Sequence, residues 1–154
     1  MERETLITAM KDSISEVLEK MFFLPLDFSE DENERTLWES KKDDVLVSKM
    51  DFSGPISGSY ILFTPNGLAI SLAASFMGTD DETLSDEQVH ETLKEILNMI
   101  VGNTFCIFDD QTIVNLGLPE MTTFDNMDAT TSSGEEIFIA INTLDESLAL
   151  KIVL

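Results

Sequence analysis

The sequence contains a single cysteine, Cys106, and a single histidine, His90. One cysteine cannot form a disulfide within the chain, and such scarcity is typical of proteins that fold in a reducing cytoplasm. A metal site needs several ligands, and no second soft ligand stands near His90, so we expect no metal centre. Cys106 lies among Phe105, Ile107 and Phe108, which favours packing in the core over a reactive thiol.

Basic residues are also scarce. Nine lysines and arginines stand against 30 aspartates and glutamates, which gives a formal net charge of −21. A surface of this sign repels nucleic acid and anionic membranes, so we expect neither as a partner. The negative charge does not identify a partner, because acidic residues commonly serve solubility.

Long apolar runs are absent. The run from Leu68 to Met77 is interrupted by Ser71 and Ser75 and is too short to cross a bilayer. Met1 is followed at once by Glu2 and Glu4, which does not fit a basic leader, so we expect no signal peptide and a cytoplasmic protein. The 154 residues, 43% of them hydrophobic, fit one globular domain that spans 1–154.

The first half of the chain predicts a helix, a hairpin and a shorter helix. An amphipathic helix is expected over 4–22, ended by Pro25, with its core positions at helical spacing: Met10, Ile14, Val17, Leu18 and Met21. Polar residues 27–42 predict a loop with a short turn near Trp38. Strands at 44–52 and 56–63 are joined by the turn residues 53–55, a second turn covers 64–67, and a buried helix at 68–77 ends at Gly78.

The second half predicts a long helix followed by strands. Ser85 and Gln88 have the spacing of a capping box before a helix over 86–105, and Leu84 and Val89 have that of a hydrophobic staple. Candidate strands cover 112–117, 122–130, 136–142 and 147–153, with turns at Ser133–Gly134 and Asp145–Glu146.

A shift of 79 residues superimposes the two halves. It places the core positions of the first helix on those of the second: Val89, Leu93, Ile96, Leu97 and Ile100. It also places Tyr60–Leu62 on Ile139–Ile141 without a gap. Two pseudo-repeats, about 1–79 and 80–154, predict an α+β fold with an approximate two-fold axis, in which a mixed or antiparallel sheet is packed by two long helices and a short one. The alternative is that any two amphipathic helices can be slid into register.

The helix over 86–105 carries a second line of residues opposite its core stripe. Glu91, Glu95, Asn98 and Gly102 are spaced so that their side chains stack along one exposed line. Asparagine and glycine are poor choices inside a helix, and glycine costs about 1 kcal/mol relative to alanine there. A surface that another molecule approaches closely would favour the glycine. The alternative is that the glutamates are ordinary solubilising charges and Asn98 is incidental.

These residues resemble a known motif. Glu95-Ile96-Leu97-Asn98, followed by Ile100 and Val101-Gly102-Asn103, resembles the ExxN helix of the CheC, CheX and FliY phosphatases. The other expected elements follow the family's order over most of the chain. The chain looks closest to CheX, because only one site is complete. In the first helix the 79-residue shift gives Asp12, Glu16, Glu19 and Phe23 as the counterparts of the exposed line. Two positions depart from the family pattern, Glu91 in place of Asp or Ser, and Pro119, whose spacing is short.

The resemblance implies a phosphatase that acts on the phospho-aspartate of a CheY-like receiver domain. It implies that Asn98 positions the attacking water, that Glu95 pairs with a receiver lysine, and that Glu91, Lys94 and Gly102 contact the receiver. The receiver supplies Mg²⁺, so no cofactor of the chain's own is expected. It further implies a homodimer. Two alternatives stay open, a receiver-binding module without catalysis, as in flagellar switch components, and a structural domain in which the Glu91–Gly102 line packs against another helix.

Overall fold

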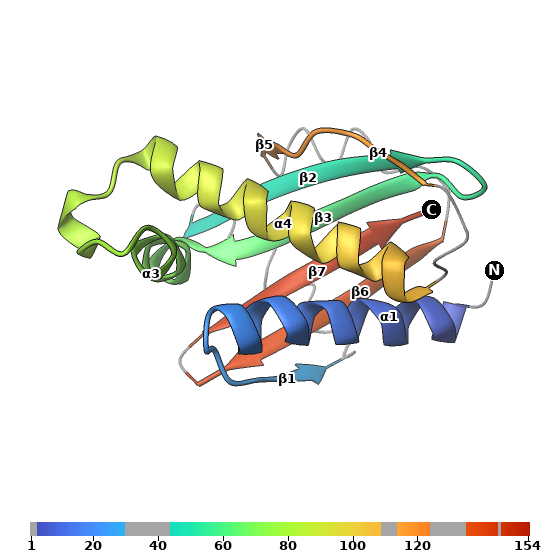
Figure 1. Cartoon of the computed structure of the whole chain (residues 1–154), viewed down its shortest axis with the longest axis horizontal. Coiled ribbons are helices and arrows are strands. Elements are labelled where there is room, and N and C mark those ends of the chain that lie inside the picture. The colour runs from blue at the N-terminus through green and yellow to red at the C-terminus, as the bar shows by residue number, and fades with distance from the viewer. Residues whose placement is uncertain (1–2, 30–43, 109–113, 124–134, 145) are drawn as a thin grey trace.

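Two long helices cross one face of a single sheet in the computed structural model (Figure 1). The first, α1 (Arg3–Ser15), continues into a π-helix, η1 (Glu16–Met21), and the second is α4 (Asp86–Phe108). A shorter helix, α3 (Asn66–Met77), lies at one end of this layer and is followed by one turn of 3-10 helix, η3 (Asp81–Thr83). The structure describes residues 3–29, 44–108, 114–123, 135–144 and 146–154.

Seven strands form the sheet, and every strand pair in the described ranges is antiparallel. The order along the sheet is β1-β6-β7-β3-β2-β4, and β5 also pairs with β2. The strands are β1 (Leu26–Ser29), β2 (Val45–Ser53), β3 (Gly58–Pro65), β4 (Asn115–Leu116), β5 (Glu120–Thr122), β6 (Glu136–Thr143) and β7 (Ser147–Val153). The predicted α+β class, one sheet packed by two long helices and a short one, is confirmed.

The strand order is symmetric about the central β3–β7 pair. Each of these two strands forms a hairpin with its outer neighbour, β2 for β3 and β6 for β7. This order agrees with two related halves, and it relates β3 to β7. The sequence match instead placed Tyr60–Leu62 of β3 on Ile139–Ile141 of β6, so this strand correspondence is wrong. The repeat boundaries at 1–79 and 80–154 stay a prediction.

The helices are held on the sheet by their predicted apolar stripes. Met10, Ile14, Val17 and Leu18 have no exposed surface, and they pack in one cluster with residues of α4 and the sheet. The hydroxyl of Ser13 donates to the backbone oxygen of Ile100 over 2.6 Å, which ties α1 to α4. Each buried Leu or Ile side chain contributes about 1.5–3 kcal/mol. Packing of this kind fixes which face of α4 points away from the sheet.

One predicted core residue of the first helix is exposed. Met21 was expected in the stripe, but 54% of it is exposed. Residues Glu16–Met21 form a π-helix, whose bonds run to the fifth residue, so one turn holds more residues than in an α-helix. The side chains at its end are therefore rotated away from the positions that a 3.6-residue period predicts.

Three predictions about loops and strands are also wrong. Residues 27–42 were expected to be a loop, but Leu26–Ser29 form β1, which pairs with β6. The turn predicted at 64–67 does not exist, because β3 runs to Pro65 and α3 begins at Asn66. In place of a strand starting at 122, β5 covers Glu120–Thr122 and ends there. The rest of the predicted strand 122–130, the turn at Trp38 and the turn at 133–134 lie outside the described residues.

Candidate functional site

The start of α4 is fixed by the predicted capping box. The backbone N–H of Ser85 donates to Oε1 of Gln88 over 2.9 Å, and the backbone N–H of Gln88 donates to the Ser85 hydroxyl over 3.2 Å. Asp86 and Glu87 add negative charge to the first turn, where the helix dipole is positive. These local contacts set where the helix begins, and with it the residues that share each face.

Replacing Ser85 with alanine removes one half of this cap. We expect the free energy of unfolding to fall by about 1 kcal/mol, because the N–H of Gln88 loses its acceptor. Urea unfolding followed by circular dichroism measures the change. Ser75→Ala is the matched control, since Ser75 is exposed inside α3 and its loss should change stability by less than about 0.5 kcal/mol. Equal effects of the two variants would contradict the cap.

The inner face of α4 is buried along its length. The five positions predicted for the core stripe are each at most 5% exposed: Val89, Leu93, Ile96, Leu97 and Ile100. Below the second half of the helix, the ring of Phe105 lies 4.9 Å from that of Phe52 and 6.0 Å from that of Tyr60. Burial raises the pKa of the Tyr60 hydroxyl, so this cluster stays uncharged. These apolar contacts prevent α4 from turning about its long axis, so the same residues always face away from the sheet.

The outer face carries the predicted line of four residues. Glu91 and Glu95 are exposed, while Asn98 and Gly102 are half-buried. Among the described residues, no hydrogen bond or ion pair involves the side chain of Glu95 or of Asn98. The two groups are three residues apart, so they lie on the same side of the helix about one turn from each other. A carboxylate and a carboxamide are therefore available together to a molecule that approaches this face.

Gly102 leaves open space at the end of the line. A Cβ placed on Gly102 would have no neighbour within 4 Å. Packing against the described parts of the chain therefore does not require glycine here, although glycine weakens a helix by about 1 kcal/mol. Because glycine has no side chain, nothing projects from the helix beside Asn98, and the backbone of a partner protein can approach closely there.

An ion pair lies beside this line. Nζ of Lys94 is 2.6 Å from Oε1 of Glu91, and the Lys94 side chain is 26% exposed against 63% for Glu91. Exposed pairs of this kind contribute less than about 1 kcal/mol to stability. The pair directs Lys94 toward the start of the helix and away from Asn98, which lies one turn in the other direction. Lys94 therefore does not donate a hydrogen bond to the carboxamide of Asn98.

The first helix offers no equivalent pair. Its counterpart positions Asp12, Glu16 and Glu19 are exposed, and Lys20 binds Glu16 over 2.8 Å. Residues 3–21 contain no asparagine, and the π-helix changes the spacing of their side chains. Within the described chain, the carboxylate and carboxamide therefore occur together on the outer face of α4 and not on the first helix.

Cys106 was expected in the core and is exposed. The helix continues to Phe108, and Val101, Thr104 and Phe105 extend the buried stripe, which leaves Cys106 on the outer side.

No group of three or more His, Cys, Asp or Glu side chains in the described ranges could hold a metal ion. In the same ranges, no helix has the length and apolar character needed to span a membrane.

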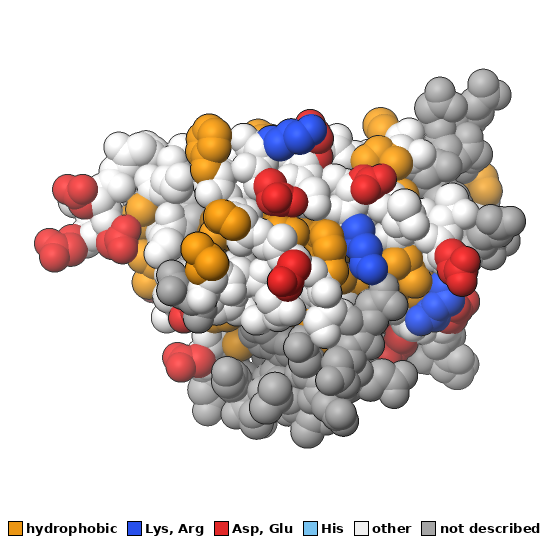
Figure 2. Space-filling model, turned by 90° about the horizontal axis from the view of Figure 1, so that it is seen from below, with side chains coloured by type: hydrophobic (Ala, Val, Ile, Leu, Met, Phe, Trp, Pro, Cys, Tyr) orange, Lys and Arg blue, Asp and Glu red, His pale blue; other side chains and the backbone are white. Residues whose placement is uncertain are grey.

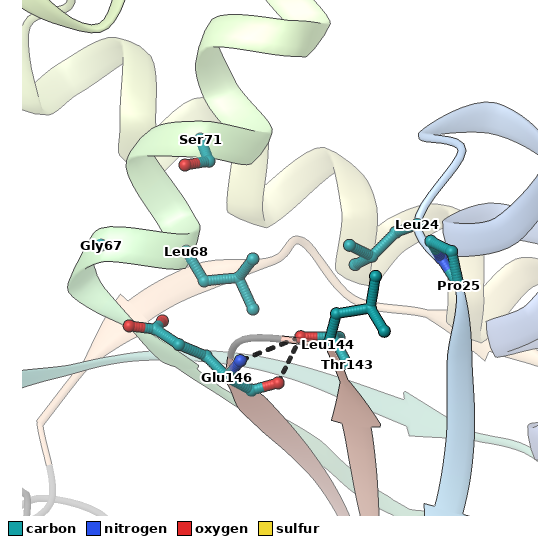
Figure 3. A pocket seen from close by; sticks show the side chains of 8 residues that line it. All are labelled: Leu24, Pro25, Gly67, Leu68, Ser71, Thr143, Leu144 and Glu146. Carbon is teal, nitrogen blue, oxygen red and sulfur yellow. Dashed lines mark hydrogen bonds between the residues drawn. The ribbon is translucent and has the colours of Figure 1, made fainter.

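A cavity of about 400 Å³ lies away from this helix face. Figure 3 shows it between the start of α3, the residues before β1 and the turn between β6 and β7. Its walls are Leu24, Pro25, Gly67, Leu68, Ser71, Thr143, Leu144 and Glu146. None of these residues belongs to α4, so this cavity is separate from the Glu95–Asn98 pair.

Solved structures share this fold. A chain of the CheX–CheY complex with BeF3 and Mg²⁺ from Borrelia burgdorferi has a TM-score of 0.74 at 18% identity, with 96% of each chain covered. CheX from Vibrio vulnificus gives 0.73 at 17% identity, with 96% of this chain and 95% of that one covered. FliY from Thermotoga maritima gives 0.59 at 15% identity, with 99% and 91% covered.

The family comparison is more specific than these distant structures. A search of curated proteins finds no match. The family model for the chemotaxis phosphatase CheX matches residues 46–142, which is more than half of the chain and includes α4 through Phe108. The chain therefore belongs to the CheX family of chemotaxis phosphatases.

Proposed function

We propose that this protein hydrolyses the aspartyl phosphate of a CheY-like receiver domain, with Glu95 and Asn98 on α4 as the residues that act on it. The observation that carries the proposal is the availability of both side chains on the outer face of a rigidly packed helix. Membership of the CheX family supports it, as does the CheX–CheY complex of a protein with this fold.

Asn98 is the group that positions the nucleophile. Its carboxamide can accept a hydrogen bond from a water and donate one to it, which holds the water in line with the phosphorus–oxygen bond. The water oxygen bonds to phosphorus, the bond to the aspartyl oxygen breaks, and the products are inorganic phosphate and a free aspartate. An asparagine is not a base, so this residue contributes orientation and not proton abstraction.

Glu95 is proposed to bind the receiver. Its exposed carboxylate is suited to a lysine of the receiver's active site, one helical turn from the point where Asn98 acts. The receiver supplies the phosphoryl group and Mg²⁺, so the chain needs no cofactor of its own. Glu91, Lys94 and the open surface at Gly102 flank the two residues and are proposed to contact the receiver.

The expected rate effect fits one well-placed polar group. Such a group contributes roughly 3 kcal/mol to transition-state stabilisation, or about a hundredfold in rate. Acyl phosphates hydrolyse without an enzyme, so this factor is enough to shorten the life of a phosphorylated receiver substantially.

The direct test is to add the purified protein to receivers labelled with radioactive phosphate and to follow the loss of label. We expect the decay rate of one or more CheY-like receivers to rise with protein concentration and then saturate. Decay that stays at the spontaneous rate for every CheY-like receiver of the source organism would contradict the proposal.

Glu95→Gln tests the role of the carboxylate. We expect the protein concentration that gives half of the maximal decay rate to rise about tenfold, because the charge-assisted bond to a lysine is lost. The maximal rate should change much less, since Asn98 is intact. Glu4→Gln is the control, because Glu4 is exposed at the far end of α1 and carries the same charge. If both variants raise the half-maximal concentration equally, Glu95 contributes only to the net charge, which would contradict its proposed bond to a receiver lysine.

A second candidate function is a receiver-binding module without catalysis. The FliM middle domain from Vibrio alginolyticus shares this fold, with a TM-score of 0.59 at 13% identity and 97% of this chain and 92% of that one covered, and it supports this candidate. Such a module would bind a phosphorylated receiver while the lifetime of its phosphoryl group stays unchanged, so the decay assay separates the two functions. The resemblance also implies a homodimer, and this stays a prediction. Sedimentation velocity measures the oligomeric state.

A further inference from the structure

Four large apolar side chains are exposed where the first helix and α3 end. Phe23 is 84% exposed, Met21 54%, Met77 46% and Phe76 45%. The rings of Phe22 and Phe76 are 5.9 Å apart, so the ends of the two helices touch. Figure 2 shows hydrophobic side chains exposed toward the end of the molecule that carries α3. We call the exposed side chains of Met21, Phe23, Phe76 and Met77 the apolar patch.

The backbone of Phe23 is unusual for an aromatic residue. Its φ angle is 53°, in the left-handed region that aromatic residues rarely adopt. The backbone N–H of Leu24 donates to the oxygen of Leu18 over 3.0 Å and closes the turn that places Phe23 in solvent. Glycine or asparagine would fit this conformation with less strain, and neither would expose an aromatic ring. Strained residues and π-helical turns are both enriched at functional sites.

The apolar surface continues from the patch into the cavity. Leu24, which follows Phe23, lines the cavity together with Leu68 of α3 and Leu144, and Figure 3 shows these three side chains converging on it. Leu144 is 85% exposed at the turn between β6 and β7. Large contiguous apolar surfaces with a polar border mark sites where another protein binds.

The border of the patch is mostly acidic. Glu19 precedes Met21, and Asp80, Asp81 and Glu82 follow Met77 in the chain, all of them exposed. Lys20, next to Met21, is the basic residue at this border, and its charge is paired with Glu16. Figure 2 shows acidic side chains at the tip of this end. A complementary partner surface is therefore apolar at its centre and basic at its edge.

The patch and the Glu95–Asn98 pair belong to the same packed layer. Ala69 and Ala73 of α3 are buried against Val89 and Leu93 of α4, in one cluster on the side opposite to the exposed line. The position of the patch relative to Asn98 is thus fixed by the core. A partner that binds the patch is held at a constant distance from Asn98.

We propose that the apolar patch is a second contact surface for the receiver domain, which it anchors beside α4 so that Asn98 reaches the phosphoryl group. This inference rests on the proposed function. The receiver segment that it binds is apolar with lysine or arginine at its edge. The apolar patch contributes to the affinity for the receiver, and Asn98 remains the residue that positions the attacking water.

Phe23→Asn is the first test, because it removes the ring and fits the backbone better. We expect the protein to unfold at the same or a higher denaturant concentration. The concentration for half-maximal decay of the labelled receiver should rise about tenfold, with the maximal decay rate unchanged. Titration of the same receiver carrying Mg²⁺ and beryllium fluoride should show the same loss of affinity. A residue with only a structural role would not lose binding while the fold gains stability.

Met77→Ser and Leu118→Ser complete the test. Met77→Ser at the end of α3 should weaken binding in the same direction. Leu118, 89% exposed between β4 and β5, is the matched control outside the patch, and Leu118→Ser should bind like the parent. Unchanged receiver affinity in Phe23→Asn overturns the inference, whereas a maximal rate that survives Asn98→Ala overturns the proposed function. A dimer that dissociates in Phe23→Asn while receiver affinity stays constant would assign the patch to self-association and also overturn the inference.

Discussion

Asn98→Ala should lower the maximal rate of receiver dephosphorylation about a hundredfold, while the free energy of unfolding stays within about 0.5 kcal/mol of the parent. The side chain is half-buried and forms no hydrogen bond with the described chain, so the fold loses little when it is removed. The attacking water loses the group that accepts from it and donates to it. Receiver binding should persist, because Glu95 and the flanking surface are intact.

Single-turnover decay of the labelled receiver at saturating protein measures this effect. Asn103→Ala is the matched control, since it removes the same carboxamide from the same helix at a half-buried position off the exposed line. The control should retain the parent rate. Equal rates for Asn98→Ala and the parent would show that the water is positioned by another group.

Gly102→Phe should block activity to a similar extent and leave the fold intact. A Cβ at this position has no neighbour within 4 Å among the described residues, and any residue other than proline suits a helix better than glycine. In the complex, the ring would occupy the surface that the receiver must approach. A displacement of about 1 Å at a reacting centre can cost a hundredfold in rate, so we expect a loss of that order.

Gly102→Ala separates the steric effect from the change in helix stability. It should raise the free energy of unfolding by about 1 kcal/mol, and it adds only a methyl group. Its decay rate should therefore stay much closer to the parent than that of Gly102→Phe. Full activity in the phenylalanine variant would mean that the receiver does not approach this part of α4.

The sequence was most informative about α4. Its apolar stripe follows the helical period from Val89 to Ile100, and its capping box uses two residues three positions apart. Both signals come from neighbours within a few residues, so they do not depend on the rest of the fold. For that reason the face that carries Glu95 and Asn98 could be predicted before the sheet was known.

Features that depend on distant residues were missed. Leu26–Ser29 are a strand because they pair with β6, more than a hundred residues later in the chain, and no local pattern announces this pairing. The exposure of Met21 follows from a π-helix, which the sequence period cannot distinguish from an α-helix. Cys106 was assigned to the core from apolar neighbours, although its place on the helix turns it outward.

The roles of Glu95 and Asn98 depend on groups that belong to the receiver. A glutamate and an asparagine three apart occur on many helices, and neither has a partner in the described chain that would define its chemistry. In the proposed mechanism, the phosphoryl group, the metal ion and the lysine all belong to the receiver. The motif predicts where the site lies, and in the proposed mechanism its chemistry becomes defined only in the complex.

A structure of the protein bound to its receiver with Mg²⁺ and beryllium fluoride is the measurement that bears most directly on the outer face of α4. We expect the carboxamide of Asn98 next to the beryllium fluoride, at about 2.6–3.2 Å from the site of the incoming water. A receiver seated on another surface, or a complex in which the Asn98 side chain points away from the phosphoryl mimic, would contradict the account.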